Sequence, residues 1–346
     1  MNQLTTKTRR LPAEWEHQDG VLLAWPHPAT DWNPILSQIE PVFASIIAAI
    51  SRFERVILIV PAEDSARERL AAADTDLDLV TFVVIPTNDT WARDFGPVTI
   101  YEDNRPLHLD FGFNGWGGKF AADLDNLINC SLKDKGILKG RMLSLPLLLE
   151  GGSIESDGNG TLLTTSQCLL NCNRNSGLNR EQVEQKLAAE LGIDRFLWLE
   201  HGYLAGDDTD AHIDTLARLC PEDTILYVAC HDSQDEHFQE LSAMRGELEK
   251  FRTREGNPYR LLPLPLPAQC FGLEGERIPV TYANFLIING AVLVPTYNDP
   301  QDDIALAAVR EAFPGREIIG INCLPAVLQH GSLHCLTMQL PKGTLS

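Results

Sequence analysis

Short apolar runs rich in β-branched residues recur along the chain, and most are bounded by Pro, Gly, Asn or Asp. Runs of this kind predict β-strands. They occupy Val21–Trp25, Val56–Val60, Val80–Ile85, Val98–Tyr101, Thr161–Thr165, Thr224–Val228 and Phe285–Val294.

Between the predicted strands, apolar residues recur at the three- and four-residue spacing of amphipathic helices. These segments are Ile35–Phe53, Ala62–Ala73, Arg180–Leu191, Gln234–Arg252 and, with only approximate spacing, Ile304–Phe313. Strands that alternate with helices favour an α/β fold class.

The predicted strands also recur at a nearly even interval. Those that begin at Val98, Thr161, Thr224 and Phe285 start 63, 63 and 61 residues apart. This period is too long for common helical solenoids and suits a radial array of small α/β units, whose loops would meet at the centre.

The alternating run Leu262–Pro267 predicts an extended surface connection rather than a domain boundary. Length alone is compatible with two domains, and a single domain of repeats fits equally well.

Composition adds a strong negative charge to this picture. The chain has 346 residues, 44% of them hydrophobic, with 28 Lys and Arg against 48 Asp and Glu, for a formal net charge of −20. Such a field would repel nucleic acid and anionic membranes and attract cations. A small cationic substrate fits it, although acidity can also serve solubility alone.

The eight cysteines show no paired C-x-x-C motif and no disulfide-like rhythm, which favours reduced thiols in a cytosolic setting. Residues 1–12 are polar and basic, without the apolar stretch of a secretory signal. No apolar run approaches the roughly 18 residues needed to cross a bilayer. We therefore expect a cytoplasmic protein.

Three remote motifs carry groups suited to attack on a guanidinium carbon: Trp91–Asp94, Asp210–Asp214 and Leu333–Cys335. A guanidinium is a planar cation, so a hydrolase needs carboxylates for its N–H groups, a nucleophile and a proton donor. Asp94 and Asp214 are 120 residues apart, and Asp214 and Cys335 are 121 residues apart. The equal intervals indicate equivalent positions in repeated units.

The first two motifs each have a structural alternative. Asp94 could accept two guanidinium N–H bonds while Trp91 stacks on the cation, or the motif could hold a structural Arg–Asp pair with Trp91 in the core. His212 and Asp214 would share one face of an extended segment and act as base and carboxylate. A divalent metal site is the alternative for this acidic cluster.

Cys335 begins a β-like run and could point into a cleft, where a bound cation or His212 would favour its thiolate. A buried structural cysteine is the alternative. His334 would face the other side of an extended strand, so His212 is the predicted base. Glu150 precedes Gly151-Gly152 at a tight turn and could bind a second edge of the substrate, or be an incidental turn residue.

Two further polar loops suggest no chemistry and are predicted to build the walls of the site. They are residues Asn114–Gly118 and Asn173–Asn175.

At these motifs the chain resembles the agmatine deiminases and the bacterial, Porphyromonas-type, peptidyl-arginine deiminases of the guanidino-group-modifying superfamily. The match runs nearly end to end, so we expect residues 1–346 to form one catalytic domain. The matching segments are Leu11–Glu16, Asn88–Asp94, Glu150–Ile154, Asp208–Asp214, Tyr282–Phe285 and His334–Thr337.

The resemblance implies a five-bladed, pseudo-symmetric α/β propeller, the pentein fold, with repeats of about 60–70 residues around a central active site. It implies Cys335 as nucleophile, His212 as general acid and base, and Asp94 and Asp214 as guanidinium clamps. Trp91, Glu150, His330 and Gly331 would line the substrate site. Trp91 and Glu150 are carried over from the family pattern, whereas His330 and Gly331 are assigned from their position beside the nucleophile.

The family reaction needs no metal or organic cofactor. We expect hydrolysis of agmatine to N-carbamoylputrescine and ammonia through a covalent amidino-cysteine, in putrescine and polyamine biosynthesis. Peptidyl-arginine or another guanidine is the alternative substrate, and a non-catalytic protein that binds cationic amines is a remote one. We expect no nucleic acid or membrane partner, and a homo-oligomer is compatible with the superfamily.

The chain departs from the agmatine deiminase pattern beside the nucleophile. Gln329–Cys335 reads Gln-His-Gly-Ser-Leu-His-Cys where Gly-Gly-Gly-Asn-Ile-His-Cys is usual, and Ala211 and Thr215 replace Gly and Asn. His330 adds bulk at the predicted pocket rim. These departures bear on the choice among guanidines.

Overall fold

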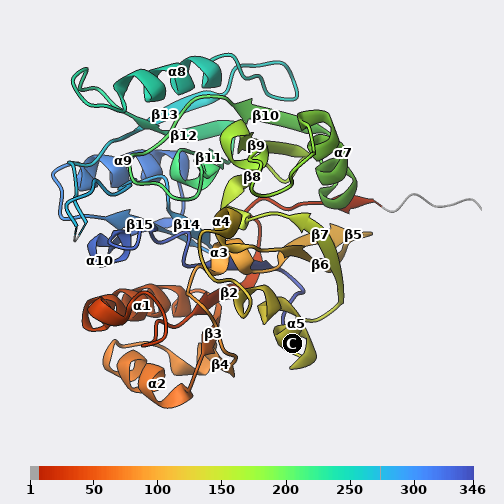
Figure 1. The fold of residues 1–346 in the computed structure, drawn as a ribbon, viewed down its shortest axis with the longest axis vertical. Coiled ribbons are helices and arrows are strands. Elements are labelled where there is room, and N and C mark those ends of the chain that lie inside the picture. The colour runs from red at the N-terminus through yellow and green to blue at the C-terminus, as the bar shows by residue number, and fades with distance from the viewer. Residues whose placement is uncertain (1–7, 273) are drawn as a thin grey trace, which may run out of the picture.

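Five small mixed β-sheets organise the computed structural model, which describes residues 8–272 and 274–346 (Figure 1). Of the segment inspected for a signal sequence, residues 1–7 lie outside the described part. The α/β class predicted from the alternating pattern is confirmed.

One order of elements occurs in each sheet: an antiparallel strand pair, a helix, and a third strand parallel to the second. The simplest example is β8 (Ile154–Ser156), β9 (Thr161–Thr165), α7 (Arg180–Leu191) and β10 (Arg195–Leu199). The other sets are β5 (Val98–Glu102), β6 (Arg105–Gly112), α5 (Ile128–Asp134) and β7 (Arg141–Leu148); β11 (Ala217–Cys220), β12 (Thr224–Ala229), α8 (Phe238–Leu248) and β13 (Arg260–Pro265); β14 (Leu286–Ile288), β15 (Ala291–Thr296), α9 (Asp302–Ala312) and β16 (Glu317–Asn322); and β17 (Met338–Pro341), β2 (Gln18–Ala24), α1 (Leu36–Ser51) and β3 (Arg55–Val60).

Two sheets are extended to four strands. β1 (Arg9–Arg10) pairs with β5, and β4 (Val80–Val84), which follows α2 (Glu63–Ala72), pairs with β3. Single helical turns complete the fold at α3 (Ala92–Phe95), α4 (Gly115–Gly118), α6 (Ser166–Leu169) and α10 (Leu324–Val327).

The even spacing of the predicted strands compared strands that are not equivalent in the repeats. Val98 and Phe285 belong to the first strand of a hairpin or the turn before it, whereas Thr161 and Thr224 begin the second strand. Equivalent second strands begin at residues 105, 161, 224 and 291, which is a less regular series. A repeat is present, but its interval varies because the hairpins and crossover loops differ in length.

Two sequence predictions require correction. Phe285–Val294 is a hairpin, not one strand, because Asn289-Gly290 forms its turn and Gly290 adopts φ 77°. Leu262–Pro265 lies within strand β13 rather than in a surface connection. Pro263 and Pro265 fit there because β13 is an edge strand, where a missing N–H is tolerated.

The stretch Asn33–Ser51 passes the length and composition test for a membrane helix, with mean hydropathy 1.5, contrary to the sequence expectation. Within the fold, 56% of its most apolar window is buried. Its helix α1 packs against β3, β16 and α2. The same apolar residues are thus accounted for by packing in the core.

The predicted functional motifs share one position in the repeats, the loop just before the first strand. Asp94 lies in α3 before β5, and Cys335 precedes β17. His212 precedes the 3-10 turn η5 (Ile213–Thr215) before β11, and Asp214 lies within this turn. The turn η4 (Gly151–Ser153) precedes β8 in the same way and contacts both α3 and η5. In Figure 1, α3 and α4 lie near the middle of the view, while the longer helices lie toward its rim.

Candidate active site

A cavity of about 180 Å³ opens where these loops meet. Four carboxylates contribute to its wall, and none of the described residues that line it is Lys or Arg. The lining residues are Asp31, Asp89, Trp91, Asp94, Trp116, Phe120, Asp208, Thr209, Gln329, His330, Gly331 and Cys335. The cavity therefore suits a cation with apolar flanks.

Cys335 lies in a turn before β17, not at the start of the strand as predicted. The Asn284 side chain holds it twice: Nδ2 donates to Cys335 Sγ at 3.2 Å, and Oδ1 accepts from the Cys335 N–H at 3.2 Å. The Arg93 N–H also donates to the Cys335 carbonyl at 3.1 Å. These bonds fix a thiol that is 5% exposed at the cavity wall.

Asp94 is buried and oriented from two sides. Its Oδ1 accepts from the Gly152 N–H at 2.9 Å, and its Oδ2 accepts from Trp116 Nε1 at 2.8 Å. The short helix α3 presents this carboxylate at the cavity. Two neutral donors can hold its orientation without cancelling its charge, so the carboxylate can still attract a cation.

Asp214 contacts the thiol, with Oδ2 at 3.8 Å from Cys335 Sγ. His334 Nδ1 is hydrogen-bonded to the same Oδ2 at 2.7 Å, and its Nε2 contacts Glu14 Oε2 at 2.7 Å. Both ring nitrogens of His334 are therefore occupied by carboxylates. Asp214 Oδ1 is buried and has no hydrogen-bond partner within the described chain, so it can accept from a ligand.

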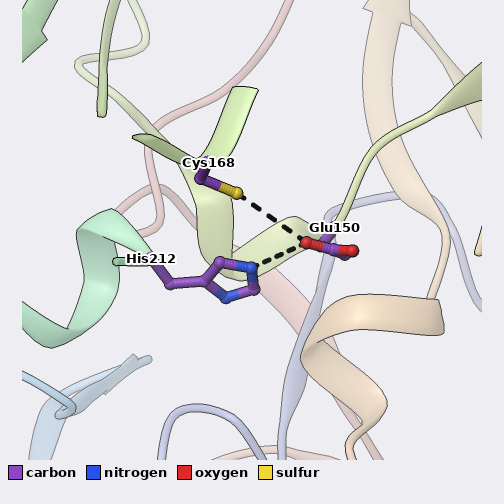
Figure 2. Close-up of side chains that lie close together, drawn as sticks. All are labelled: Glu150, Cys168 and His212. Carbon is purple, nitrogen blue, oxygen red and sulfur yellow. Dashed lines mark hydrogen bonds and ion pairs between the residues drawn. The ribbon is translucent and has the colours of Figure 1, made fainter. Parts of the chain in front are cut away.

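His212 has one engaged and one free ring nitrogen. Nε2 bonds Glu150 Oε2 at 2.8 Å, whereas Nδ1 lies 3.7 Å from Asp94 Oδ1 without a hydrogen-bond partner among the described residues. Figure 2 shows the Glu150 carboxylate bonded to both His212 and Cys168. Because Glu150 accepts the Nε2 proton, Nδ1 is the nitrogen available for proton transfer.

The expectation that His212 and Asp214 share a face of an extended segment is wrong. His212 is the residue before η5, and Asp214 lies inside this tight turn. Their side chains approach the same site because the turn redirects the backbone.

Gly152 brings the backbone directly beneath the reacting groups. A Cβ at this position would lie 2.6 Å from His212 Nδ1, 2.9 Å from Asp94 Oδ1 and 3.1 Å from Asp214 Oδ2. The absence of a side chain at Gly152 is what allows these three groups to converge.

The ionisation of these groups follows from burial and charge. Burial raises the pKa of the Cys335 thiol well above its usual value, and the Asp214 and Asp94 charges raise it further. Burial also raises the pKa of Asp94. For His212, burial alone would lower the pKa, but Asp94 and its hydrogen-bonded neighbours outweigh it, so the pKa is raised well above 6.5. The resting site therefore pairs a neutral thiol with an imidazolium.

The other predicted substrate residues divide between the cavity and the layer behind it. Trp91 lines the cavity and packs on Trp32, with ring centroids 5.5 Å apart. His330 and Gly331 also line it, and the backbone of Gly331 lies against the Trp91 ring. Glu150 is not among the lining residues; it is buried behind His212.

Two clusters could present ligand atoms to a metal ion. They are Glu150, Cys168 and His212, and Glu14, Glu155 and His334. In each cluster an arginine already bonds a carboxylate: Arg174 bonds Glu150, and Arg218 bonds both Glu14 and Glu155. A metal ion would have to compete with these guanidinium groups.

Sequence reasoning missed three residues that shape the site: Trp116, Asn284 and Arg174. Trp116 and Arg174 lie in the two loops predicted only to build walls. A usable signal was present at Trp116, because a large aromatic residue stands between glycines in a polar loop; in the structure this Trp adopts an unusual φ of 54°. Asn284 lies in the matching segment Tyr282–Phe285, but no role was assigned to it, and Arg174 carried no signal, because its partners are remote in sequence.

Comparison with known proteins agrees with this geometry. The family model for Porphyromonas-type peptidyl-arginine deiminase matches residues 10–341. An agmatine deiminase of Stutzerimonas stutzeri is 33% identical, and the alignment covers 99% of each chain.

Solved structures give the same result. A C. jejuni agmatine deiminase, determined as a cysteine-to-serine variant with substrate bound, is 40% identical with a TM-score of 0.91 and 99% of both chains covered. A Porphyromonas gingivalis protein, provisionally named an arginine deiminase, is 48% identical with a TM-score of 0.92, covering 98% of this chain and all of its own. The resemblance first seen in the motifs is confirmed: the chain belongs to the Porphyromonas-type peptidyl-arginine deiminase family.

Proposed function

We propose that this protein is a hydrolase of linear amidines that converts agmatine to N-carbamoylputrescine and ammonia, a step toward putrescine. The observation that carries the proposal is that Cys335 and Asp94 line one acidic cavity. Asp214 and His212 lie next to them, with Asp214 Oδ2 3.8 Å from Cys335 Sγ and His212 Nδ1 3.7 Å from Asp94 Oδ1. Full-length relatives named agmatine deiminase support it.

In the proposed reaction, the guanidinium lies between Asp94 and the unpartnered Oδ1 of Asp214. Its charge offsets the two carboxylates that raise the pKa of Cys335, so the thiol can release its proton to solvent when the substrate binds. The thiolate adds to the guanidinium carbon, and His212 Nδ1–H protonates the departing ammonia. Holding both edges of the planar cation presents its face to the sulfur.

The second half of the reaction releases the product. Neutral His212 removes a proton from water, and the resulting hydroxide adds to the amidino carbon. The C–S bond then breaks, and the sulfur leaves with the electron pair. The hydroxyl proton of the adduct passes to this sulfur as the carbonyl forms, which restores the neutral thiol, and His212 keeps the proton that it took from water.

The cavity also favours agmatine over free arginine. Asp31, Asp89 and Asp208 line it in addition to Asp94, and burial raises the pKa of Asp89 to about 7. A second cationic group would stabilise the ionised form of these carboxylates. The carboxylate of arginine would meet negative charge with no lysine or arginine among the described lining residues.

Peptidyl-arginine, or another guanidine, is a second candidate substrate. It is favoured by the description of the matched family and by 45% identity to a solved structure provisionally named a peptidyl-arginine deiminase. An arginine within a peptide lacks the free carboxylate of arginine, so the acidic cavity would not repel it in the same way.

Ammonia release from agmatine, arginine and a blocked peptidyl-arginine separates these possibilities. We expect agmatine to be turned over fastest, and Cys335→Ala and His212→Ala to lose activity while remaining folded. Asp94→Asn should lower kcat/KM for cationic guanidines. Cys130→Ala, at an exposed cysteine remote from the cavity lining, is the control. Faster turnover of peptidyl-arginine would still agree with a deiminase but would contradict agmatine as the substrate.

We further infer that the five repeats are blades of one closed, pseudo-symmetric pentein propeller and that residues 1–346 act as one catalytic domain in the cytoplasm. The repeated order of elements supports this arrangement. We propose no metal or organic cofactor and no nucleic acid or membrane partner. Full activity after chelation would agree with a thiol mechanism, and light scattering would establish whether the protein forms a homo-oligomer.

A further inference from the structure

A short loop, residues 206–211, forms one side of the cavity and leads directly into His212. Asp208 and Thr209 line the cavity. Asp207 stabilises the loop internally, because its carboxylate accepts from the Thr209 and Ala211 N–H groups at 3.0 and 2.6 Å. A ligand in the cavity therefore touches a segment that is continuous with the predicted general acid.

Arg174 connects this loop to the other side of His212. Its Nη1 donates to Asp210 Oδ2 at 2.6 Å, and its Nη2 donates to the Thr209 carbonyl at 2.9 Å. Its Nε donates to both Glu150 oxygens, at 2.9 and 2.8 Å. Glu150 in turn fixes His212 Nε2.

We propose that Arg174 is a positioning residue that couples the conformation of loop 206–211 to the orientation of His212 through Glu150. The inference rests on the proposed function, in which His212 Nδ1 transfers protons. In this proposal Arg174 does not touch the substrate. It links the conformation of loop 206–211, which forms part of the cavity wall, to the position of the proton donor His212.

The shape of the guanidinium explains why arginine is suited to this task. The Arg174 side chain is 2% exposed, and all three of its nitrogens donate to acceptors on two separate segments. A lysine would keep the positive charge but present a single ammonium group, which cannot match the planar fork. Arg174→Lys therefore removes the bridge while retaining the charge.

Lys119 provides an internal comparison. Its ammonium contacts the Asp208 carbonyl and the Asp210 carboxylate, so it holds the same loop from another side. Among its described contacts, none involves Glu150 or His212. Lys119→Gln should disturb the loop without directly disturbing the histidine.

The test is a double-mutant cycle with Arg174→Lys, Asp210→Asn and the double variant, assayed on agmatine. We expect Arg174→Lys to lower kcat by about 10- to 100-fold, with a smaller change in KM, because small misplacements of catalytic groups are costly. The effect of Asp210→Asn should largely disappear in the Arg174→Lys background. Lys119→Gln should act mainly on KM, and Arg245→Lys, in an exposed helical pair, should match the wild type.

A second readout does not depend on turnover. Imidazole ¹⁵N spectra should show a protonated, hydrogen-bonded Nε2 for His212 in the wild type, and a changed resonance in Arg174→Lys at an unchanged thermal midpoint. Additive effects of Arg174→Lys and Asp210→Asn, or a wild-type His212 resonance in Arg174→Lys, would overturn the coupling. If the wild type deiminates no guanidine, the proposed function fails, whereas the spectra still decide whether Arg174 orients His212.

Discussion

Gly152 shows how one missing side chain can define a catalytic arrangement. Its N–H orients Asp94, and the space above its Cα is shared by His212 and Asp214. A methyl group there would overlap with groups that have little freedom, because each is buried and bonded to its neighbours.

We therefore expect Gly152→Ala to lower kcat at least about 100-fold through displacement of His212 or Asp94. Steady-state kinetics and circular dichroism would measure the loss and verify the fold. Gly246→Ala is a matched control, since a Cβ on this helical glycine would meet no atom within 4 Å. Wild-type kcat in Gly152→Ala would show that the site has more room than its geometry indicates.

The elevated pKa of Cys335 predicts the pH dependence of its reactivity. Because the resting thiol is neutral, alkylation by uncharged chloroacetamide should be slow near pH 7.5 and rise about tenfold per pH unit toward the pKa. A cationic chloroacetamidine should react faster at pH 7.5, because its charge offsets Asp94 and Asp214.

Mass spectrometry resolved to Cys335, with Cys335→Ala as blank, gives both rates. Equal rates for the two reagents, together with a flat pH profile, would contradict a neutral resting thiol.

At the residue scale, the sequence identified the residues whose side chains carry the proposed chemistry. Asp94, His212, Asp214 and Cys335 stood out because charged or nucleophilic groups clustered in short motifs, and the fold places them around one site. Arg174 and Asn284 did not, because their importance depends on contacts with residues 24 and 51 positions away. Only tertiary structure reveals such partners.

At the scale of elements, periodicity located the longer helices and several buried strands, whereas β6 and β7, each of eight residues, were not predicted. Arg180–Leu191 was predicted with its final bounds, because Asn179 and Gln182 form a capping box and Gly192 ends the helix in a left-handed conformation. Very short strands were missed. β8 has three residues, too few for an alternating pattern to emerge, and β14, equally short, was merged with β15 in the predicted run Phe285–Val294.

Loop 206–211 carries strain at a residue where the related pattern has glycine. Ala211 adopts φ 63°, next to Asp210 at φ 66°. The left-handed conformation costs a non-glycine residue roughly 1–2 kcal/mol, part of which glycine loses again through its greater freedom in the unfolded chain.

Ala211→Gly should therefore raise the free energy of unfolding, by up to about 1 kcal/mol. Urea denaturation would measure it. Ala189→Gly on the exposed face of α7 should instead lower it by about 0.5–1 kcal/mol. A clear loss of stability in Ala211→Gly would mean that the alanine methyl contributes more packing than its backbone costs.

At the scale of the whole molecule, the formal charge of −20 should aid capture of a cationic substrate. We expect kcat/KM for agmatine to fall as NaCl rises from 0.05 to 0.5 M, since the Debye length shortens from above about 10 Å to below it. The effect should be steeper for agmatine than for arginine, which carries less net positive charge. Sucrose at matched osmolality is the control, and a salt-independent kcat/KM would argue against steering by the overall field.

The repeated architecture was visible in the sequence only in part. Four repeats are continuous in the chain, but the fifth combines β17 from the C-terminal part with β2, α1 and β3 from the N-terminal part. A search along the chain cannot join these halves. The site depends on this union, because Cys335 precedes the strand that pairs with β2.

The neutral resting thiol has a consequence for survival under oxidative stress. Peroxide attacks thiolates rather than thiols, so idle enzyme should resist conversion of Cys335 to sulfenic acid. Enzyme engaged with a guanidinium exposes the reactive form and should be inactivated faster, unless the ligand shields the sulfur. Oxidation of Cys335 would then increase with the number of catalytic turnovers. Loss of activity during peroxide treatment, compared with and without agmatine, would measure this dependence.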